Sequence, residues 1–139
     1  MIDKYWEHFE HEADIGIRGI APTQAEAFEQ AALALTAVIT DVNSISPTEV
    51  IEIECEAPDI EILLVDWLNS IIYEMATRKM LFSKFNVKIH NLQLKARLYG
   101  ETLDIRKHQP AVEIKGATYT ALSVRQDGNM WLAECVLDV

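Results

Sequence analysis

The sequence gathers two carboxylates and an imidazole at one point near its start. In the stretch HEADIGIRG, His11, Glu12 and Asp14 fall within four residues and lead into the alternating Ile15 and Ile17. Such alternation is typical of a β-strand with one buried face. Carboxylates and imidazoles at a strand entrance can ligate a cation or act as general acids and bases. We therefore treat this strand entrance as a candidate site.

Other ionisable residues stand outside the predicted core pattern further along the chain. Asp41 follows a predicted helix, and Glu101, Asp104 and His108 share one polar loop. Lys115 lies in the strand predicted after that loop. The imidazole of His108 is a second candidate for a ligand or an acid–base group.

The chain end carries the most specific signal. It stops on a strand pattern, so Asp138 and the α-carboxylate of Val139 offer hard oxygen donors one residue apart. Ca²⁺, Mg²⁺ and Mn²⁺ prefer such ligands, and bunched carboxylates need a cation or a raised pKa. The same residues also suit a solvated chain end with a surface aspartate, which is the usual state of that residue.

Known catalytic patterns are missing from the sequence. No two histidines have zinc-ligand spacing with a cysteine, and there is no P-loop, GxGxxG or GxSxG motif and no Ser-His-Asp order. These observations argue against a structural zinc site and against nucleotide-binding or serine-hydrolase enzymes of these types.

Composition sets the broad class. The 139 residues are half hydrophobic and carry a net charge of −10, which predicts one globular domain over residues 1–139 and argues against direct nucleic-acid binding. No apolar leader opens the chain, and its longest near-apolar stretch is too polar to span a bilayer. Cys55 and Cys135 both occupy the alternating apolar positions of predicted strands, so we expect them to be buried and reduced. We therefore expect a cytoplasmic protein with no membrane contact.

The periodicity predicts an α+β fold, with two helices packed on a mixed, largely antiparallel β-sheet. Thr23 and Glu26 form a capping box at the start of the first helix. Asp127-Gly128 is a hairpin signal between the last two strands. The predicted helices cover residues 24–39 and about 59–79. The predicted strands cover residues 5–9, 15–20, 50–56, 81–90, 92–99, 112–125 and 130–137, with an irregular loop over 100–110.

Seven short motifs, in order along the chain, resemble those of the archease family. HEADIG resembles the family's H-T-A-D-I-G, and ALALTAVITD ending at Asp41 resembles A-L-x-x-x-(M/I)-T-D. LLVDWLNSIIYEM resembles the core-helix pattern, LFSKF fits the strand that follows, and GETLDIRKH resembles G-E-x-x-D-x-x-x-H. EIKGATY and the terminal Asp138-Val139 resemble two further family motifs. Together they span nearly the whole chain, whereas each alone is weak.

The resemblance implies an accessory protein and not an enzyme. Archeases assist the RtcB-type tRNA-splicing RNA ligase, which forms a covalent guanylate on its own histidine with GTP and divalent metal. They accelerate that guanylylation and permit repeated turnover. The resemblance also implies a divalent cation, calcium in the family with magnesium or manganese possible, held by Asp14, Asp138 and Val139. His11, Asp41, Glu101, Asp104, His108 and Lys115 then support the site.

The sequence departs from the family pattern at two points, and it leaves two other functions open. Glu12 replaces the usual threonine and adds a carboxylate beside the implied metal site. Thr120-Ala121-Leu122 stands where the family usually has His-Gly-Leu. Clustered carboxylates also suit a metal-dependent phosphoesterase. A small acidic protein also suits a general chaperone or adaptor.

Overall fold

A computed structural model describes residues 3–139 of the chain. Within them the elements follow in the order β1 (Tyr5–His11), β2 (Asp14–Ala21), α1 (Gln24–Ile39), the 3₁₀ helix η1 (Val42–Ser44), β3 (Glu49–Glu56), α2 (Ile60–Arg78), β4 (Met80–His90), β5 (Gln93–Thr102), α3 (Ile105–His108), β6 (Gly116–Ala117), β7 (Ser123–Asp127) and β8 (Met130–Asp138). The order of helices and strands gives the α+β class that the sequence predicts.

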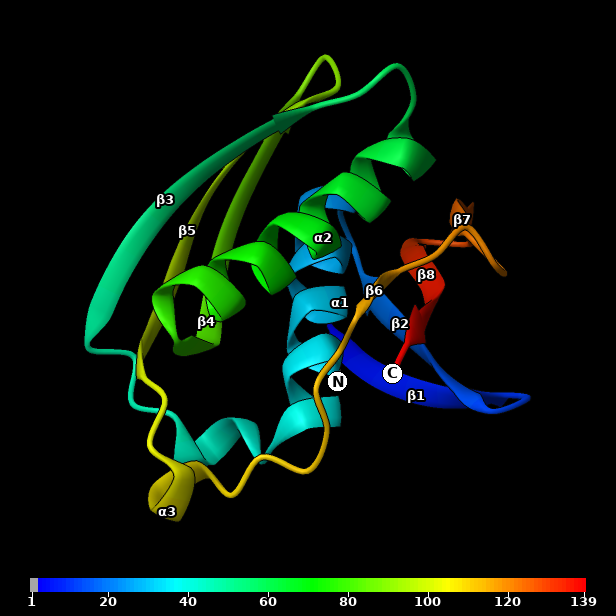
Figure 1. Cartoon of the computed structure of the whole chain (residues 1–139). Helices are drawn as coiled ribbons and strands as arrows, with labels where there is room; N and C mark the ends of the chain where they lie inside the picture. The colour runs from blue at the N-terminus through cyan, green and yellow to red at the C-terminus, as the bar shows by residue number, and fades with distance from the viewer. Residues whose placement is uncertain (1–2) are drawn as a thin grey trace.

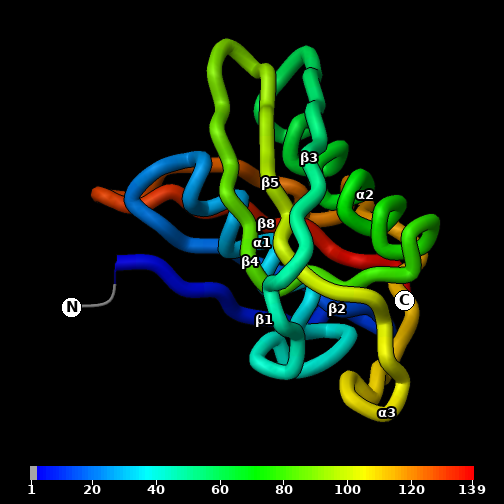
Figure 2. Tube along the Cα trace, turned by 90° about the vertical axis from the view of Figure 1, so that its left-hand side faces the viewer, coloured from blue at the N-terminus to red at the C-terminus, as the bar shows by residue number. Residues whose placement is uncertain are grey.

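The strands form two sheets instead of one. One sheet has the order β1-β2-β8-β6, with β7 also paired to β8, and the other has the order β3-β5-β4. Every strand pairing in residues 3–139 is antiparallel. Helix α1 contacts β2 of one sheet and β4 of the other, while α2 contacts β3 and β6 (Figure 1). Seen from the side of β3, β5 and β4, the three strands lie in front of α1, with α2 beside β3 (Figure 2).

Local signals determine both long helices as expected. Thr23 Oγ1 accepts a hydrogen bond from the Glu26 amide at 3.1 Å and donates to the Glu26 carboxylate at 3.0 Å, which closes the N-terminus of α1. Asp59 caps α2 by accepting from the Ile62 amide at 2.8 Å. Lys79 ends α2 in the left-handed conformation with φ 55°.

Helix α2 forms the centre of the core, as its apolar pattern predicts. Trp67 is fully buried and its Nε1 donates a hydrogen bond of 3.0 Å to the carbonyl of Phe28 in α1. Its ring meets Phe85 of β4 edge to face. One indole therefore joins both helices and the β3-β5-β4 sheet. None of the helices in residues 3–139 has both the length and the apolar character needed to cross a membrane.

Two segment predictions were wrong. The predicted long strand over 112–125 contains only the two-residue β6 and the short β7. The segment is interrupted because Ala111 bonds to Ile39 of α1 and the Leu122 amide closes a turn onto the Tyr119 carbonyl. The predicted irregular loop over 100–110 contains the end of β5 and the helix α3. Asp104 caps α3 by accepting from the amides of Arg106 and Lys107, a bond pattern that favours a helical turn.

The remaining local predictions agree with the structure. The hairpin predicted at Asp127-Gly128 is present: Asp127 pairs with Met130, and Gly128, the first central residue of the turn, has φ 62°. Both cysteines are free thiols, Cys135 fully buried and Cys55 half-buried. Burial raises the pKa of Cys135 to about 12, which keeps this thiol in its unreactive protonated form.

Helix α1 lies directly on β2 at Gly19. A Cβ added there would overlap the backbone of α1 at Ala27 and Ala31. We therefore predict that Gly19→Ala lowers the free energy of unfolding by about 3 kcal/mol, because overpacking forces backbone elements apart. Urea unfolding followed by circular dichroism measures this.

Gly116→Ala is the matched control for this substitution. A Cβ at Gly116 would meet the Asn69 side chain at 3.5 Å, an ordinary contact. It should change the free energy of unfolding by less than about 1 kcal/mol. Equal unfolding midpoints for Gly19→Ala and the native chain would contradict the close approach.

Candidate functional site

The pairing of β2 with β8 brings the first candidate carboxylates together. Ile15 lies opposite Leu137 in antiparallel register, so Asp14 and Asp138 are the next cross-strand neighbours. Directly opposed residues share one face of a sheet, with Cβ atoms about 5 Å apart. Asp14 is half-buried and Asp138 is exposed. We call the surface formed by Asp14, Asp138 and Val139 the acidic tip.

His11 extends the same row on the other side of Asp14. It pairs with Asp14 across the β1–β2 hairpin, whose turn residue Glu12 has φ 54°. The row His11–Asp14–Asp138 therefore crosses three strands of one sheet. The exposed Glu12 side chain lies in the turn beside this row.

Lys115 and Gly116 fix the position of Asp138 on the side of β8 that faces away from β2. The Lys115 amide donates a 2.8 Å hydrogen bond to the Asp138 carbonyl, and Gly116 of β6 pairs with Asp138. The next residue, Ala117, donates to Asn69 Oδ1 of α2 at 2.9 Å. Sheet and helix together therefore hold the end of β8.

Within the described residues, the acidic tip places two carboxylates side by side without a basic partner. Neither Asp14 nor Asp138 has a salt-bridge partner among residues 3–139. Like charges on directly opposed strand positions destabilise a sheet, and a cation between them relieves this. The described part of the chain has no group of three or more His, Cys, Asp or Glu side chains placed to hold a metal. Within residues 3–139 the tip therefore offers two carboxylate side chains, those of Asp14 and Asp138.

The second set of candidate residues forms a separate cluster at the end of β5. The Glu101 carboxylate accepts three hydrogen bonds: from Lys107 Nζ at 2.7 Å, from the Ser46 amide at 2.8 Å and from His108 Nε2 at 2.9 Å. The Asp104 amide donates to His108 Nδ1 at 2.9 Å, which fixes the tautomer of the ring. We call these residues, Ser46, Glu101, Asp104, Lys107 and His108, the α3 junction.

Electrostatics keep the α3 junction charged. Hydrogen bonds from Lys107, from the Ser46 amide and from His108 lower the pKa of Glu101 to about 2. The His108 side chain is fully buried, and the Glu101 side chain is 19% exposed. His108 therefore links the Glu101 carboxylate to the start of α3 through a fully buried ring.

The junction also holds the segment that leads to the acidic tip. Thr40 Oγ1 donates to the His108 carbonyl, and the Ala111 amide donates to the Ile39 carbonyl at 2.8 Å. Asp41 caps η1 by accepting from the Asn43 amide at 2.9 Å, next to the junction in sequence. Residues 109–115 are thus fixed at one end by the junction and at the other by Asp138. In Figure 1, α3 lies well away from the chain end.

An ion-pair network on the outer face of the first sheet was missed from the sequence. Arg18 binds Glu134 through Nε and Nη2 at 3.1 and 3.2 Å and Glu7 through Nη1 at 2.6 Å. Arg125 also donates to Glu134 at 2.7 Å. Burial would raise the pKa of Glu134, but the bonds from the two arginines outweigh it and lower the pKa. The network depends on three strand pairings, since β1–β2 places Glu7 opposite Arg18, β2–β8 places Arg18 opposite Glu134, and β7–β8 brings Arg125 close to Glu134.

The comparisons with known proteins place the chain in a family. The model of the "Archease protein family (MTH1598/TM1083)" matches residues 6–139. The chain belongs to the archease family. The Pyrococcus abyssi protein archease is 42% identical over 98% of this chain and 99% of its own length, and that of Sulfurisphaera tokodaii is 38% identical over 96% and 98%.

Solved structures share the archease fold. The solution structure of Methanobacterium thermoautotrophicum protein 1598 aligns with a TM-score of 0.85 at 31% identity, over 96% of this chain and 98% of that one. The crystal structure described as "an archease, possible chaperone" from Thermotoga maritima aligns with a TM-score of 0.59 at 20% identity over 96% of each chain. The second likeness concerns the fold alone.

The low pKa of Glu101 predicts that its contribution to the stability of the folded chain is lost in acid. A carboxylate whose folded-state pKa lies below its usual 4.5 stabilises the folded chain above that pH, and the contribution is lost as pH falls towards about 2. Glu101→Gln should therefore lower the melting temperature at pH 7, and the difference from the native chain should shrink as the solution is acidified.

Thermal unfolding at a series of pH values measures this difference. Glu10→Gln, which removes an exposed carboxylate from β1, controls for the general loss of a negative charge. A Glu101→Gln deficit that stays constant down to pH 2 would show that the Glu101 charge does not stabilise the α3 junction.

Proposed function

We propose that this archease-family protein activates an RtcB-type RNA ligase through its acidic tip. The observation that carries the proposal is the register of β2 and β8, which makes Asp14 and Asp138 neighbours. Family membership supports the same function. The tip docks at the nucleotide pocket of the ligase, promotes guanylylation of the ligase histidine and so permits repeated turnover.

In this proposal Asp14, Asp138 and Val139 hold a divalent cation, calcium by family likeness. The bound cation supplies positive charge that can face phosphate oxygens. Phosphoryl transfer depends mostly on positioning and charge neutralisation, so a partner protein that organises charge can have a large effect on its rate. Asp14 and Asp138 supply the donors, and His11 orients the hairpin beside them.

The remaining residues keep the tip in place. Lys115 fixes the Asp138 main chain by its amide. Glu101, Asp104 and His108 anchor the other end of the segment that leads there. Asp41 holds η1, which precedes the Ser46 amide of the α3 junction. These are positioning residues in the proposal, and none of them contacts the ligase nucleotide.

The first test follows guanylylation of the ligase from the same organism. The reaction contains GTP, manganese and this protein in substoichiometric amount. We expect Asp138→Ala to abolish the acceleration, because one donor of the tip is lost. Asp127→Ala, which removes an exposed aspartate from the β7–β8 turn, should accelerate the ligase like the native chain. Full acceleration by Asp138→Ala would refute the role of the tip.

A second measurement tests cation binding independently of ligase activation. Ligands that bind only the folded state stabilise it by about 2.7 kcal/mol at a hundred times their dissociation constant. Calcium should therefore raise the melting temperature of the native chain and of Asp127→Ala, but not that of Asp138→Ala. Stabilisation of Asp138→Ala to the same extent would place the cation elsewhere.

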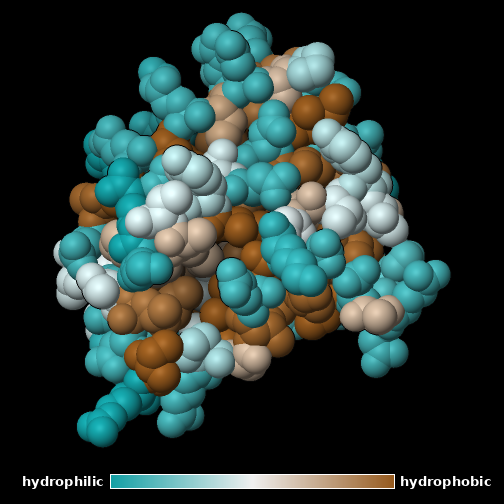
Figure 3. All heavy atoms as spheres, in the orientation of Figure 1, coloured by the Kyte–Doolittle hydropathy of each residue, from teal (hydrophilic) through white to brown (hydrophobic). Residues whose placement is uncertain are grey.

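A chaperone or adaptor is the second candidate, and a hollow in the surface favours it. The hollow measures about 540 Å³ and lies between α2, the start of β4 and residues 110–114. Most of its lining is apolar, including Ile72, Met75 and Leu103. Apolar side chains reach the surface in the lower half of Figure 3, which shows this side of the molecule. The archease from Thermotoga maritima is likewise described as a possible chaperone.

The two candidates predict opposite effects of two substitutions. Val112 lies at the hollow and is 38% exposed. If the hollow binds unfolded chains, Val112→Asp should reduce suppression of citrate synthase aggregation at least severalfold, and Asp138→Ala should leave it unchanged. Light scattering measures this. Lack of suppression by the native chain would dismiss the chaperone function.

The phosphoesterase alternative gains no support from the described residues. Such an enzyme needs a metal cluster with a water or side-chain nucleophile beside it. Residues 3–139 offer no group of three metal-ligating side chains, and the tip carries two aspartates and a chain end. We do not propose this function.

A further inference from the structure

Strand β3 leaves one long edge of its sheet open. It pairs only with β5, so it lies at the border of the β3-β5-β4 sheet. The Ala57 amide donates to the Leu92 carbonyl, which identifies this pair as hydrogen-bonded. Because hydrogen-bonded and non-hydrogen-bonded pairs alternate in an antiparallel ladder, Val50, Glu52 and Glu54, followed by Glu56, turn their main-chain N–H and C=O groups to the open edge.

These edge groups have no partner in the part of the chain that the structure describes. No hydrogen bond between elements of residues 3–139 reaches the main chain of Val50, Glu52, Glu54 or Glu56. An exposed row of unpaired N–H and C=O groups is a template for one more strand. Many domains bind extended peptides in this way, with main-chain bonds for affinity and side-chain pockets for specificity.

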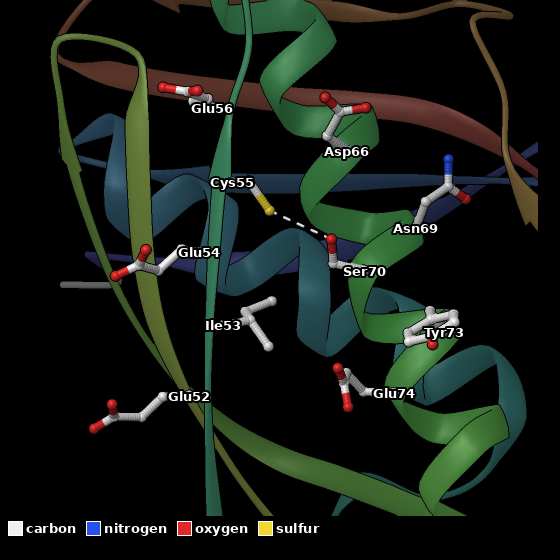
Figure 4. A pocket seen from close by; sticks show the side chains of 10 residues that line it. All are labelled: Glu52, Ile53, Glu54, Cys55, Glu56, Asp66, Asn69, Ser70, Tyr73 and Glu74. Carbon is white, nitrogen blue, oxygen red and sulfur yellow. Dashed lines mark hydrogen bonds between the residues drawn. The ribbon is translucent and has the colours of Figure 1, made fainter.

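A groove runs along this edge, between β3 and α2. It measures about 560 Å³, and α2 contributes one wall through the polar stripe Asp66, Asn69, Ser70, Tyr73 and Glu74. In Figure 4, Ile53 and Cys55 point from β3 towards α2, while Glu52, Glu54 and Glu56 point to the opposite side of the strand. Cys55 Sγ lies 3.3 Å from Ser70 Oγ and closes the floor between the two elements.

The charge of the groove selects the kind of partner. Its lining holds five carboxylates and no lysine or arginine, and one of the five, Glu74, is already paired with Arg78 of α2. On the outer face, Glu52 pairs with Arg97 of β5 at 3.3 Å and Glu54 with Lys95 at 3.8 Å, both strongly exposed and therefore weak. Charge thus changes sign from β5 to β3, and basic residues on an added strand would continue the alternation.

A second copy of this chain does not fit the edge. Pairing β3 with β3 of another molecule would bring glutamates opposite glutamates, which destabilises a strand pair. Charged residues on an edge are a known defence against such self-association. The same carboxylates attract a strand that carries lysine or arginine at alternate positions.

From these observations we propose that the open edge of β3 binds an extended, Lys/Arg-bearing segment of a partner protein as an added strand. The main chain of Val50, Glu52, Glu54 and Glu56 forms the ladder. On the outer face, Glu52, Glu54 and Glu56 receive the basic side chains. On the other face, Asp66 of α2 receives a polar or basic group, and the 64%-exposed Tyr73 offers an aromatic surface. This surface is separate from the acidic tip and is independent of the ligase.

The experiment titrates the ¹⁵N-labelled full chain with the peptide Ac-KVKTKVK-NH₂ and follows amide chemical shifts and hydrogen exchange. We expect saturable shifts centred on β3 and slower exchange at the outward amides of Glu52 and Glu54. In an antiparallel pair the lysines opposite the glutamates also turn their main-chain N–H groups to β3. The control is the same peptide with N-methyl groups on the main-chain nitrogens of its two central lysines, which keeps the charge but removes two ladder donors. It should bind roughly tenfold more weakly.

Two substitutions of Glu54 distinguish the contribution of its main-chain N–H group to peptide binding from the contribution of its side-chain charge. Glu54→Pro removes an outward N–H and leaves the ladder to β5 intact, because proline is tolerated where the amide faces the open edge. It should weaken peptide binding roughly tenfold, whereas Glu54→Gln should weaken it less than about threefold.

Three results would overturn the proposal. They are equal binding of the two peptides by the native chain, shifts that map away from β3, and native-like binding by Glu54→Pro. If Glu54→Pro does not fold, the comparison of the two peptides on the native chain decides the question alone.

Discussion

The pairing of β2 with β8 is the interaction on which the rest of the structure depends. The salt bridge from Arg18 to Glu134 joins residues 116 positions apart, so this pairing closes nearly the whole chain. Loop closure over such a length costs conformational entropy before any contact compensates it. Once formed, β8 supports β6 and β7 on its other side and presents Asp138 beside Asp14. The helix α1 then lies on β2 where Gly19 leaves space.

The sequence predicts those parts of the fold that local chemistry determines. Thr23, Asp59 and Gly128 act within a few residues, through caps and a turn, and their elements lie where the pattern puts them. The division into two sheets could not be predicted, because strand alternation shows which face is buried but not which strand lies alongside. The segment over 111–122 looks like a strand for the same reason. Its main chain finds partners in α1, β8 and its own turn, which alternation cannot show.

The candidate site shows the same limit. The oxygen donors at the end of the last predicted strand are enough to single out Asp138 and Val139. Resemblance to the family adds Asp14 to them. The register of β2 and β8 then makes the two aspartates neighbours. Glu101, Asp104 and His108 stand out as charged residues of one loop, and the structure brings them together. The Ser46 amide, 55 residues before Glu101, is a partner that no local pattern could reveal. Polar networks of this kind arise from the packing of distant segments.

The buried imidazole of His108 provides the molecule with an internal reporter. Its Nδ1 accepts from a main-chain amide, so the proton resides on Nε2 and points at the Glu101 carboxylate, while the ring itself is fully buried. Ring protons in such surroundings exchange slowly with solvent and are strongly deshielded. The Nε2 proton should therefore give a resolved low-field NMR resonance. That single line would follow the integrity of α3 and of the segment leading to the chain end without any label or substitution.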